Sequence, residues 1–560
     1  MRTIPKDLFV YLALFGVLFS GLITFYAIVP QNYLPPPKKP NIIIIMADDV
    51  GRNDVGFHGS SQIPTPNIDA LAYNGIILDR FYSQCSCTPS RAALLTGQYP
   101  IRMGMQGLPI RAGENKSLPL HVTTMPQHLK RLGYTTHLVG KWHMGYAHIR
   151  DTPLQRGFDT HFGYWNGFVG YFNYTAVYEL PNDTMVKGFD LYDGVVPDWG
   201  SRGRYATDLF TEKAIDVIDG HNSEKPLFLV LAHLAAHTGE DGVELGVPDV
   251  AQAETRFSYI KDPRRRLYAD IVQRLDNSVG QIVAKLSEKK LLHNSIILFL
   301  SDNGAQTVGT YKNFGSNWPL RGVKLTEFEG GIRVPAAIYS PLFQKKGYVN
   351  RELIHITDFL PTFYAAAGGN LKYLGKIDGI NQWETLSYQK PGKRAEILAN
   401  FNEIDNVSAI ITGQYKLLQG RHSIPEYEHY YGDSGRNHGD PPYNFTAVLS
   451  SSTNRAIQNS IKIVNLRGET DLSWCRSANQ TPIMDCTEGC LFDLESDPCE
   501  TTNIIQREKI IAGRLFKRLL EFSQVLVPQQ DPVFDPDSNP QFFNGTWCTW
   551  LDSEYCPKSF

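Results

Sequence analysis

The stretch Asn41-Ile42-Ile43-Ile44-Ile45-Met46-Ala47-Asp48-Asp49 decides the fold class of this chain. Its continuous apolar run suits a strand that is buried on both faces, as strands of parallel sheets are when helices cover them. The run ends directly in two carboxylates, and open α/β sheets bind their ligands at the carboxyl ends of such strands. The stretch therefore predicts an α/β architecture together with a site at the end of this strand.

The same pattern recurs three times along the chain. Further buried strands are predicted over residues 135–139, 227–232 and 295–300, and amphipathic helices over 125–132 and 270–286. The predicted strands lead into Gly140-Lys141-Trp142-His143, Ala236-His237 and Ser301-Asp302-Asn303-Gly304. Helix followed by strand is the order that a parallel sheet requires. Polar side chains from distant parts of the chain are thus expected to meet at one edge of the sheet.

Composition restricts the class of protein. With 560 residues, 42% hydrophobic and 20% charged, the chain is too long and too apolar to be disordered or a disulfide-stapled mini-protein. Its 54 basic and 57 acidic residues give a net charge of -3, and basic residues do not cluster with aromatic ones. We therefore predict no nucleic-acid partner.

The sequence texture changes near residue 390. Beyond it we expect two short strands within 407–418 around a turn at Gly413, a third strand over 460–464, a long surface loop over 421–459 and an amphipathic helix over 507–525. We accordingly predict a large α/β domain over 41–390, a small α+β domain with an antiparallel sheet over 391–530, and a disulfide-stapled tail over 531–560.

The N-terminus differs from the rest of the chain. Leu8 to Val29 contains no charged residue, and as a helix this run would span about 33 Å, enough for a bilayer core. Arg2 and Lys6 precede it, which orients the N-terminus to the cytosol and the remainder to the lumen. We predict an uncleaved type II signal-anchor within residues 1–34, with a long cleavable signal peptide as the alternative, followed by a proline-rich spacer over 35–40.

Two other features predict an oxidising, luminal compartment. Asn-x-Ser/Thr sequons occur at Asn115, Asn173, Asn182, Asn406, Asn444, Asn479 and Asn544. Six of the eight cysteines lie in the last hundred residues, which indicates local disulfides whose pairing the sequence leaves open. A zinc site at Cys486 and Cys490 is disfavoured, because no further His/Cys pair stands at a suitable spacing.

The residues that follow the strands suggest a metal site. Asp48, Asp49, Asp302 and Asn303 all offer oxygen donors, which favour Ca²⁺, or less strongly Mg²⁺, over Zn²⁺. Each carboxylate taken alone is better explained as a helix cap or a solvated loop residue. Their shared position after two expected parallel strands is what makes the metal site the better hypothesis.

The segment Cys87-Thr88-Pro89-Ser90-Arg91, followed by Leu95-Thr96-Gly97, resembles the signature of the type I sulfatases. The other elements of that family stand in order around it: Ala47-Asp48-Asp49, Gly140-Lys141-Trp142-His143, Ser301-Asp302-Asn303-Gly304 and Asn317-Trp318-Pro319-Leu320-Arg321-Gly322-Val323-Lys324. The resemblance covers about residues 41–386 and returns at 491–494. The Asn317 to Lys324 string is most similar to the arylsulfatase B branch, which acts on N-acetylgalactosamine 4-sulfate.

This resemblance implies a fold, a cofactor and a set of roles. The fold would be alkaline-phosphatase-like, a large and mostly parallel sheet between helices. Cys87 would be converted to Cα-formylglycine by the formylglycine-generating enzyme, and its hydrate would attack sulfur. The implied metal ligands are Asp48, Asp49, Asp302, Asn303 and the modified Cys87. The other implied roles are sulfate binding by Lys141 and Lys324, orientation of the hydrate by Arg91, and proton removal by His143. His237 is our candidate for the general acid at the leaving oxygen.

The implied substrate is a sulfated glycan or an aryl sulfate, with the 4-sulfate of N-acetylgalactosamine in dermatan or chondroitin sulfate as the finer prediction and the lysosome as the favoured compartment. Loops over 163–198 and 239–256 would set this specificity. Two alternatives stay open from the sequence: a formylglycine-dependent phosphonate or phosphodiester hydrolase, and a luminal glycan-binding protein without turnover.

Overall fold

The computed structural model describes residues 38–240, 242–458, 463–476, 484–530, 532–552, 554–556 and 558. The expected signal-anchor, residues 35–37 of the proline-rich spacer and the sequon at Asn479 lie outside these ranges. Within them, no helix has both the length and the apolar character needed to cross a membrane. The chain from Pro40 onward forms one compact unit.

The predicted strand at the start of the chain is the centre of a ten-stranded sheet. This strand, β1 (Asn41–Ala47), runs parallel to β10 (Leu227–Ala232) on one side and to β11 (Ser295–Ser301) on the other. All three strands are buried along their whole length, as their unbroken apolar runs predict. Beyond β10 the parallel order continues with β4 (Thr135–Lys141) and β5 (Thr160–Tyr164). The α/β prediction is confirmed.

Toward both edges the sheet includes antiparallel pairs, β11–β12–β2 on one side and β5–β8–β9 on the other, while the outermost β13 runs parallel to β2, so the sheet is mixed. The full order is β13-β2-β12-β11-β1-β10-β4-β5-β8-β9. The outer strands are β2 (Ile76–Leu78), β8 (Tyr192–Asp193), β9 (Val196–Pro197), β12 (Ala336–Tyr339) and β13 (Tyr348–Asn350), with β13 and β9 at the two edges. Two small sheets lie apart from it: the hairpin of β6 (Thr175–Glu179) with β7 (Met185–Phe189), and β3 (Phe81–Tyr82) with β14 (Ile354–His355).

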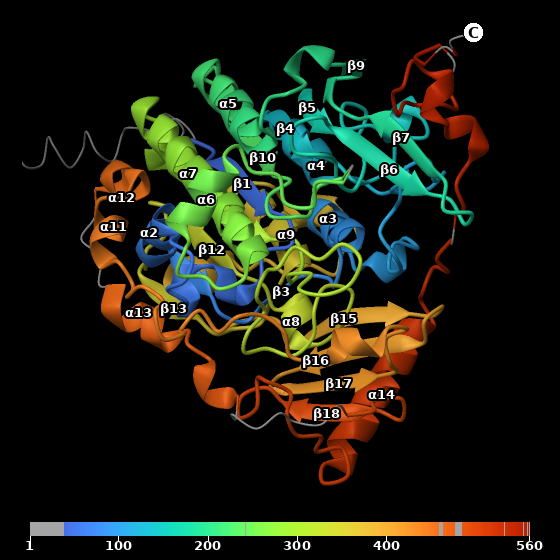
Figure 1. The fold of residues 1–560 in the computed structure, drawn as a ribbon. Coiled ribbons are helices and arrows are strands. Elements are labelled where there is room, and N and C mark those ends of the chain that lie inside the picture. The colour runs from blue at the N-terminus through green and yellow to red at the C-terminus, as the bar shows by residue number, and fades with distance from the viewer. Residues whose placement is uncertain are drawn as a thin grey trace, which may run out of the picture. The chain divides into compact units, whose positions relative to one another are not determined.

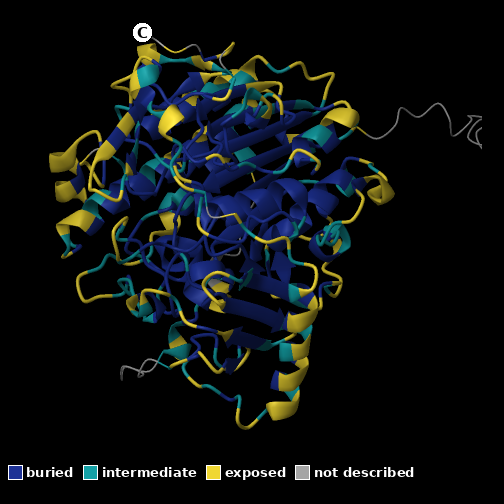
Figure 2. Ribbon diagram, turned by 90° about the vertical axis from the view of Figure 1, so that its right-hand side faces the viewer, coloured by how far each residue is buried: buried dark blue, intermediate teal, exposed yellow. Residues whose placement is uncertain are grey.

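Two groups of helices pack beside the large sheet. One contains α2 (Pro66–Asn74), α5 (Ala206–Asp219) and the long α7 (Pro263–Glu288), with α5 and α7 side by side in Figure 1. The other contains α3 (Cys87–Thr96), α4 (Met125–Arg131) and α9 (Phe359–Ala366). The strands between them are buried, and exposed residues lie mainly on loops and outer helix faces (Figure 2).

A second sheet of four antiparallel strands follows in the C-terminal part. It consists of β15 (Glu396–Asn402), β16 (Val407–Thr412), β17 (Tyr415–Gln419) and β18 (Cys490–Asp493). Alternate side chains serve opposite faces: Leu398, Ile410 and Leu417 pack on α14 (Lys509–Ser523), whereas Ile397, Ala409 and Ile411 pack with Phe328 and Ile332 of the preceding part. The expected hairpin at Gly413 and the terminal amphipathic helix are both confirmed.

The expectations for residues 421–464 need correction. The predicted surface loop contains the helices α11 (Phe445–Leu449) and α12 (Ser452–Ile457), and a helix, α13 (Ile463–Glu469), begins where the third strand was expected to end. Residues 460–462 of that strand lie outside the described ranges. Ser451 caps α12, which packs on α2 and α7. A short apolar run cannot by itself distinguish a strand from a helix, and here packing against the larger body decides.

The cysteines near the C-terminus form the predicted local disulfides. The pairs are Cys475–Cys499, Cys486–Cys490 and Cys548–Cys556. The pairing of Cys486 with Cys490 excludes the zinc alternative. Cys85 and Cys87 are the free cysteines, and both are buried.

Candidate active site

Four oxygen-bearing side chains meet where β1 and β11 end. The register pairs Ala47 with Ser301, so the next residues on each strand, Asp48 and Asp302, emerge side by side. The main-chain N–H of Asp49 donates to Oδ1 of Asp302 at 3.3 Å, and Nδ2 of Asn303 donates to Oδ1 of Asp49 at 2.5 Å. All four side chains are fully buried. Parallel pairing of two strands that are distant in sequence therefore produces the cluster.

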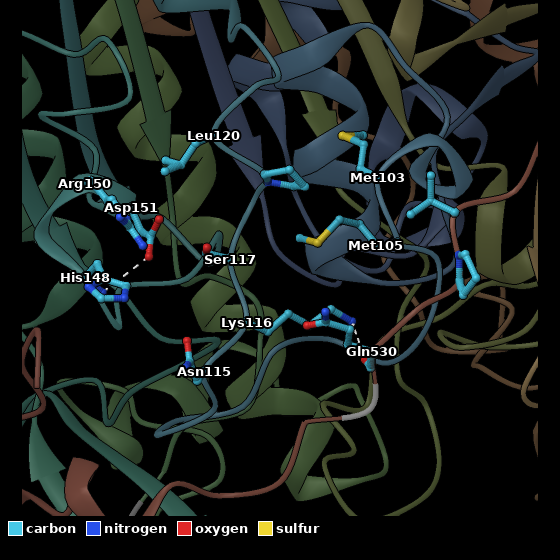
Figure 3. A pocket seen from close by; sticks show the side chains of 14 residues that line it. Met103, Met105, Asn115, Lys116, Ser117, Leu120, His148, Arg150, Asp151 and Gln530 are labelled. Carbon is cyan, nitrogen blue, oxygen red and sulfur yellow. Dashed lines mark hydrogen bonds between the residues drawn. The ribbon is translucent and has the colours of Figure 1, made fainter. Parts of the chain in front are cut away.

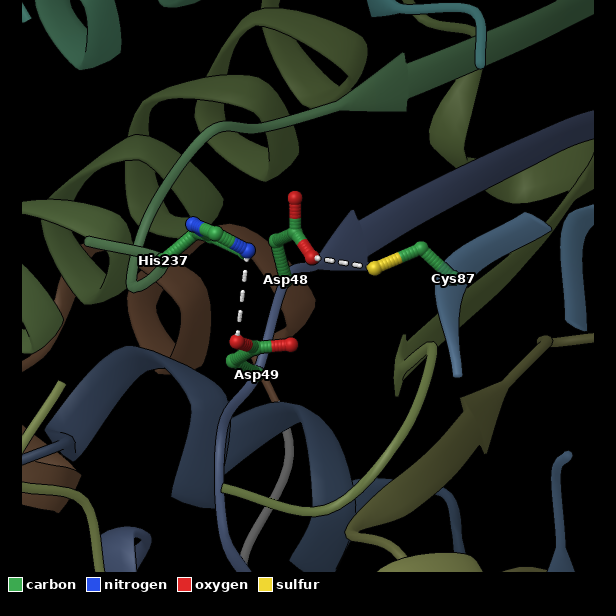
Figure 4. Close-up of side chains that lie close together, drawn as sticks. All are labelled: Asp48, Asp49, Cys87 and His237. Carbon is green, nitrogen blue, oxygen red and sulfur yellow. Dashed lines mark hydrogen bonds and ion pairs between the residues drawn. The ribbon is translucent and has the colours of Figure 1, made fainter. Parts of the chain in front are cut away.

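Cys87 lies beside this cluster, at the first residue of α3. Its Sγ is 3.6 Å from Oδ1 of Asp48, and only 2% of the residue is exposed. Ligand atoms of Asp48, Asp49, Cys87 and His237 all lie within 4.8 Å of one another (Figure 4). Burial raises the pKa of the Cys87 thiol to about 12, in spite of the nearby Lys141 and Lys324. The unmodified side chain is therefore a protonated thiol at neutral pH.

Each buried carboxylate is paired with a buried cation. Lys141, at the end of β4, lies 2.6 Å from Oδ2 of Asp48, and Lys324 lies 2.7 Å from Oδ1 of Asp49. Arg91, one turn along α3 from Cys87, donates to Oδ2 of Asp302 from Nη2 at 2.8 Å and from Nε at 3.1 Å. The three acidic and three basic side chains cancel in formal charge.

The electrostatic effect of this pairing opposes that of burial. Burial alone would raise the pKa of Asp48, but Lys141, His237 and Arg91 together hold it below its ordinary value. Burial alone would lower the pKa of Lys324, yet the neighbouring Asp49 raises it. Asp48 is therefore ionised and Lys324 protonated at neutral pH.

The two histidines have different surroundings. Nδ1 of His237 donates to the carbonyl of Thr238 at 2.8 Å, which leaves Nε2 facing Oδ2 of Asp49 at 3.5 Å. Nε2 of His143 donates to the carbonyl of Ile110 at 2.7 Å, and its Nδ1 is buried without a hydrogen-bond partner among the described residues. Burial lowers the pKa of both rings, with further lowering by Lys324 at His237 and by Lys141 at His143.

The cluster fits a hard divalent cation. Oδ1 of Asn303 is buried and has no hydrogen-bond partner in the described part of the chain. A buried acceptor without a partner is costly, and a cation would satisfy it. Three carboxylates and an amide oxygen are the donors that Ca²⁺ and Mg²⁺ prefer. Asp49 also has a left-handed backbone, with φ of 59°, a strained conformation that is often found at functional sites.

The structure adds two residues that the sequence did not single out. Nδ2 of Asn313 donates to the carbonyls of Asp49 and Ala236, at 2.8 and 3.0 Å, and so ties the end of β1 to the loop after β10. The ring of Phe168 lies 4.4 Å from the ring of His237, centroid to centroid. Phe168 falls in the loop expected to set specificity, whereas no sequence pattern distinguished Asn313.

Comparison with known proteins agrees with this geometry. A family model described as Sulfatase matches residues 40–369. The chain is 34% identical to arylsulfatase J of Mus musculus over 545 residues, covering 94% of this chain and 82% of that protein. It is 31% identical to N-acetylgalactosamine-6-sulfatase of Homo sapiens, covering 68% and 71% of the two chains. The solved structure of Ps i-CgsB in complex with k-i-k-neocarrahexaose matches with a TM-score of 0.67 and 26% identity, covering 89% of this chain and 96% of that one.

Proposed function

The chain belongs to the sulfatase family and is a hydrolase of sulfuric esters, and from this premise we propose that it removes sulfate from N-acetylgalactosamine units of a glycosaminoglycan. The observation that carries the proposal is the position of Cys87, 3.6 Å from Asp48 among buried carboxylates and lysines. The sulfate ester at position 4 is our first candidate, because the segment from Asn317 to Lys324 most resembles the arylsulfatase B branch. The name of the related N-acetylgalactosamine-6-sulfatases favours position 6 as the second.

We propose that Cys87 acts after conversion to formylglycine. The hydrated aldehyde supplies one oxygen for attack on sulfur and a second oxygen through which sulfate is released. Arg91 stands one turn along the same helix and is held by Asp302, so its guanidinium is fixed beside position 87. Conversion is the work of the formylglycine-generating enzyme, a proposed partner during biosynthesis.

We propose that Asp48, Asp49, Asp302 and Asn303, with the modified residue 87, hold a divalent cation, Ca²⁺ before Mg²⁺. When bound, the cation adds positive charge that polarises the sulfate and lowers the pKa of the nucleophile. Lys141 and Lys324 lie against Asp48 and Asp49 and so bring two ammonium groups to the oxygens of an anionic ester. Because the six charged side chains are balanced without the cation, its two charges are available to an anionic substrate.

His237 is our candidate for the general acid, and its surroundings predict the pH dependence. Burial and Lys324 lower the pKa of the ring below its usual 6.5. A general acid must carry its proton, and the protonated fraction decreases as the pH rises through this pKa. We expect kcat/KM to fall about tenfold per pH unit on an alkaline limb whose apparent pKa lies below 6.5.

The pH profile of kcat/KM between pH 4 and 8, measured with a sulfated disaccharide, checks this prediction. His237→Gln should lose most of its activity together with the alkaline limb. An unchanged limb in that variant would assign the titration to another group. His233→Gln is the matched control, since His233 is also buried but bonds through Nε2 to Ser278 at 3.0 Å, away from the cluster.

Aromatic residues beside His237 suggest where the sugar binds. Phe168 packs on the His237 ring, and Tyr311, 47% exposed, lies 5.1 Å from Phe168 in an edge-on arrangement. We propose that this pair contacts the apolar face of the sugar while its ester reaches His237. Pairs of aromatic rings contribute about 0.5–1.5 kcal/mol, and we take the contact of a ring with the C–H face of a sugar to be of similar size.

Phe168→Ala is therefore expected to raise KM for a sulfated disaccharide about 3- to 10-fold. The effect on a small aryl sulfate, which lacks the sugar, should be smaller. Phe172→Ala is the control, because Phe172 lies in the same loop but packs on Tyr205. Equal effects on both substrates would show that Phe168 only supports His237.

A defined substrate panel tests the function itself. We expect purified protein to release sulfate from a disaccharide that ends in N-acetylgalactosamine 4-sulfate, faster than from the 6-sulfate or from an aryl phosphonate. Faster release from the 6-sulfate would move the proposal to position 6. Turnover of the aryl phosphonate alone would overturn it.

We propose a luminal location, with the lysosome favoured and anchoring by the N-terminal segment as a further proposal. The three disulfides support it, because such bonds persist in oxidising compartments. We also propose that the chain is divided into a catalytic domain over 41–390, a small domain over 391–530 and a disulfide-stapled tail over 531–560.

A further inference from the structure

A large cavity lies apart from the candidate active site and shares no lining residue with it. Its volume is about 500 Å³, and it is lined from four stretches of chain, 103–105, 115–120, 148–151 and 527–530 (Figure 3). The last of these follows α14, so the cavity is formed between the large α/β part and a segment from the C-terminal region. Nothing in the sulfatase reaction requires this cavity.

The walls of the cavity suit an uncharged and amphipathic ligand. Met103, Met105 and Leu120 contribute apolar surface, and the amide of Gln530 is polar. Two of the three basic side chains are engaged: Nζ of Lys116 donates to the carbonyl of Gln530 at 3.2 Å, and His148 pairs with Asp552 at 3.2 Å. The third, Arg150, is exposed, and its charge is matched by that of Asp151 in the same wall. Apolar C–H faces beside hydrogen-bonding groups are the surface that a neutral sugar offers.

One residue of the rim can carry such a sugar covalently. Asn115 begins the sequon Asn115-Lys116-Ser117 and is exposed. No described residue forms a hydrogen bond with its side-chain amide. At two other sequons the asparagine oxygen is used locally, since Asn182 accepts from the N–H of Thr184 and Asn444 caps α11. The amide of Asn115 is thus available at the edge of the cavity.

We propose that Asn115 is N-glycosylated and that the first sugars of its glycan occupy this cavity. In the transfer, Nδ2 of Asn115 bonds to C1 of a lipid-diphosphate-linked oligosaccharide, the bond from C1 to the diphosphate oxygen breaks, and the amide proton is released. A sugar tethered at the rim has an effective concentration in the millimolar range, so weak contacts suffice to hold it. The proposal rests on the luminal location and is independent of the substrate.

The glycan would then join two parts of the fold. The segment that follows α14 is attached beside the cavity by the N–H of Val527, which donates to the carbonyl of Ile101 at 2.8 Å, and by the contact of Lys116 with Gln530. Sugars that fill the space between residues 115–120 and 527–530 add contacts to both walls. Loss of the glycan should therefore loosen the attachment of this segment.

Endoglycosidase H digestion of the intact protein, produced in mammalian cells that retain high-mannose glycans, tests the proposal by peptide mass spectrometry. We expect the Asn115 peptide to carry a glycan and to be cleaved at least about tenfold more slowly in the native than in the denatured protein. Asn182, in the exposed turn between β6 and β7, is the control site and should show a much smaller difference. Asn115→Gln should also lower Tm by about 2 °C and leave kcat unchanged.

An unmodified Asn115 would overturn the proposal, as would a glycan at Asn115 that is cleaved equally fast in the native and denatured protein. The digestion uses the unaltered chain, so it remains decisive even where Asn115→Gln fails to fold. If the unaltered protein shows no activity on the sulfated disaccharides but its Asn115 glycan resists endoglycosidase H, the proposed substrate is contradicted and this inference is not.

Discussion

Replacement of Cys87 by alanine is expected to lower kcat/KM for any sulfate ester by at least about 10⁴-fold, because alanine cannot be converted to the aldehyde hydrate whose oxygen is the proposed nucleophile. Replacement by serine should be as severe at steady state, since a serine hydroxyl has no second oxygen through which to release sulfate. With an aryl sulfate, Cys87→Ser is expected to give at most one turnover per molecule and to retain a sulfo group on residue 87. Burst kinetics and peptide mass spectrometry measure both outcomes.

Cys85 provides the matched control for this experiment. It is a second buried free cysteine two residues away, with Sγ 3.7 Å from Oε1 of Glu327 rather than against the carboxylate cluster. Cys85→Ala should keep activity within a few-fold of the unaltered protein. The same mass spectra should show an aldehyde or its hydrate at position 87 of the unaltered protein and an unmodified thiol at Cys85. Full activity with an unmodified Cys87 would contradict the proposed chemistry.

Asp49→Asn is expected to lower kcat/KM about 10³-fold and to abolish stoichiometric Ca²⁺ binding. Asp49 accepts hydrogen bonds from Asn303 and Lys324 and lies 3.5 Å from His237, so it is a central acceptor of the cluster. The substitution leaves Lys324 without its anionic partner and replaces one of the two charged carboxylate oxygens by an NH₂ group, effects that together amount to several kcal/mol of transition-state stabilisation. Metal analysis of the purified variant and steady-state kinetics measure the two effects separately.

The control for Asp49→Asn is Asp276→Asn. Asp276 is an equally buried carboxylate, but it accepts hydrogen bonds from the N–H groups of Asn67 and Ile68 at the start of α2. Its replacement should lower stability and leave metal content and kcat of the folded protein unchanged. Treatment of the unaltered protein with a chelator should reduce activity, and Ca²⁺ should restore it better than Mg²⁺. Retention of the metal by Asp49→Asn would contradict the proposed ligand set.

The central sheet and the carboxylate cluster could be predicted from sequence because both depend on local patterns. Unbroken apolar runs identified β1, β10 and β11, and parallel pairing of strands brings residues after their ends to one edge. Asp48 and Asp302 are neighbours for this reason alone. The positions of Cys87 and Lys324 depend instead on the path of a helix and a long loop, so only the family resemblance suggested that they join the cluster.

Other features left no usable trace in the sequence. Asn313 acts through main-chain carbonyls of residues that are distant in the chain, and an asparagine in a polar loop carries no signal of such contacts. The helices between residues 445 and 469 are short, and packing on α2 and α7 rather than local preference determines the one at 452–457. The cavity near Asn115 depends on where the segment after α14 returns to residues 101–116 of the large α/β part.

Because Cys87 is deeply buried, its proposed conversion to formylglycine has to take place before the chain has folded. A modifying enzyme can bind this thiol only while the surrounding chain is unfolded, since a residue that is 2% exposed in the folded protein is inaccessible to another protein. β1 acquires its β11 neighbour only after Ser295 has been synthesised, 208 residues later, which at ribosomal speed is roughly 10–40 s. A molecule that closes before Cys87 has been modified is expected to be permanently inactive. The specific activity of the purified protein should therefore depend on the rate of Cys87 modification relative to the rate of folding. Mutations that accelerate folding should increase the inactive fraction.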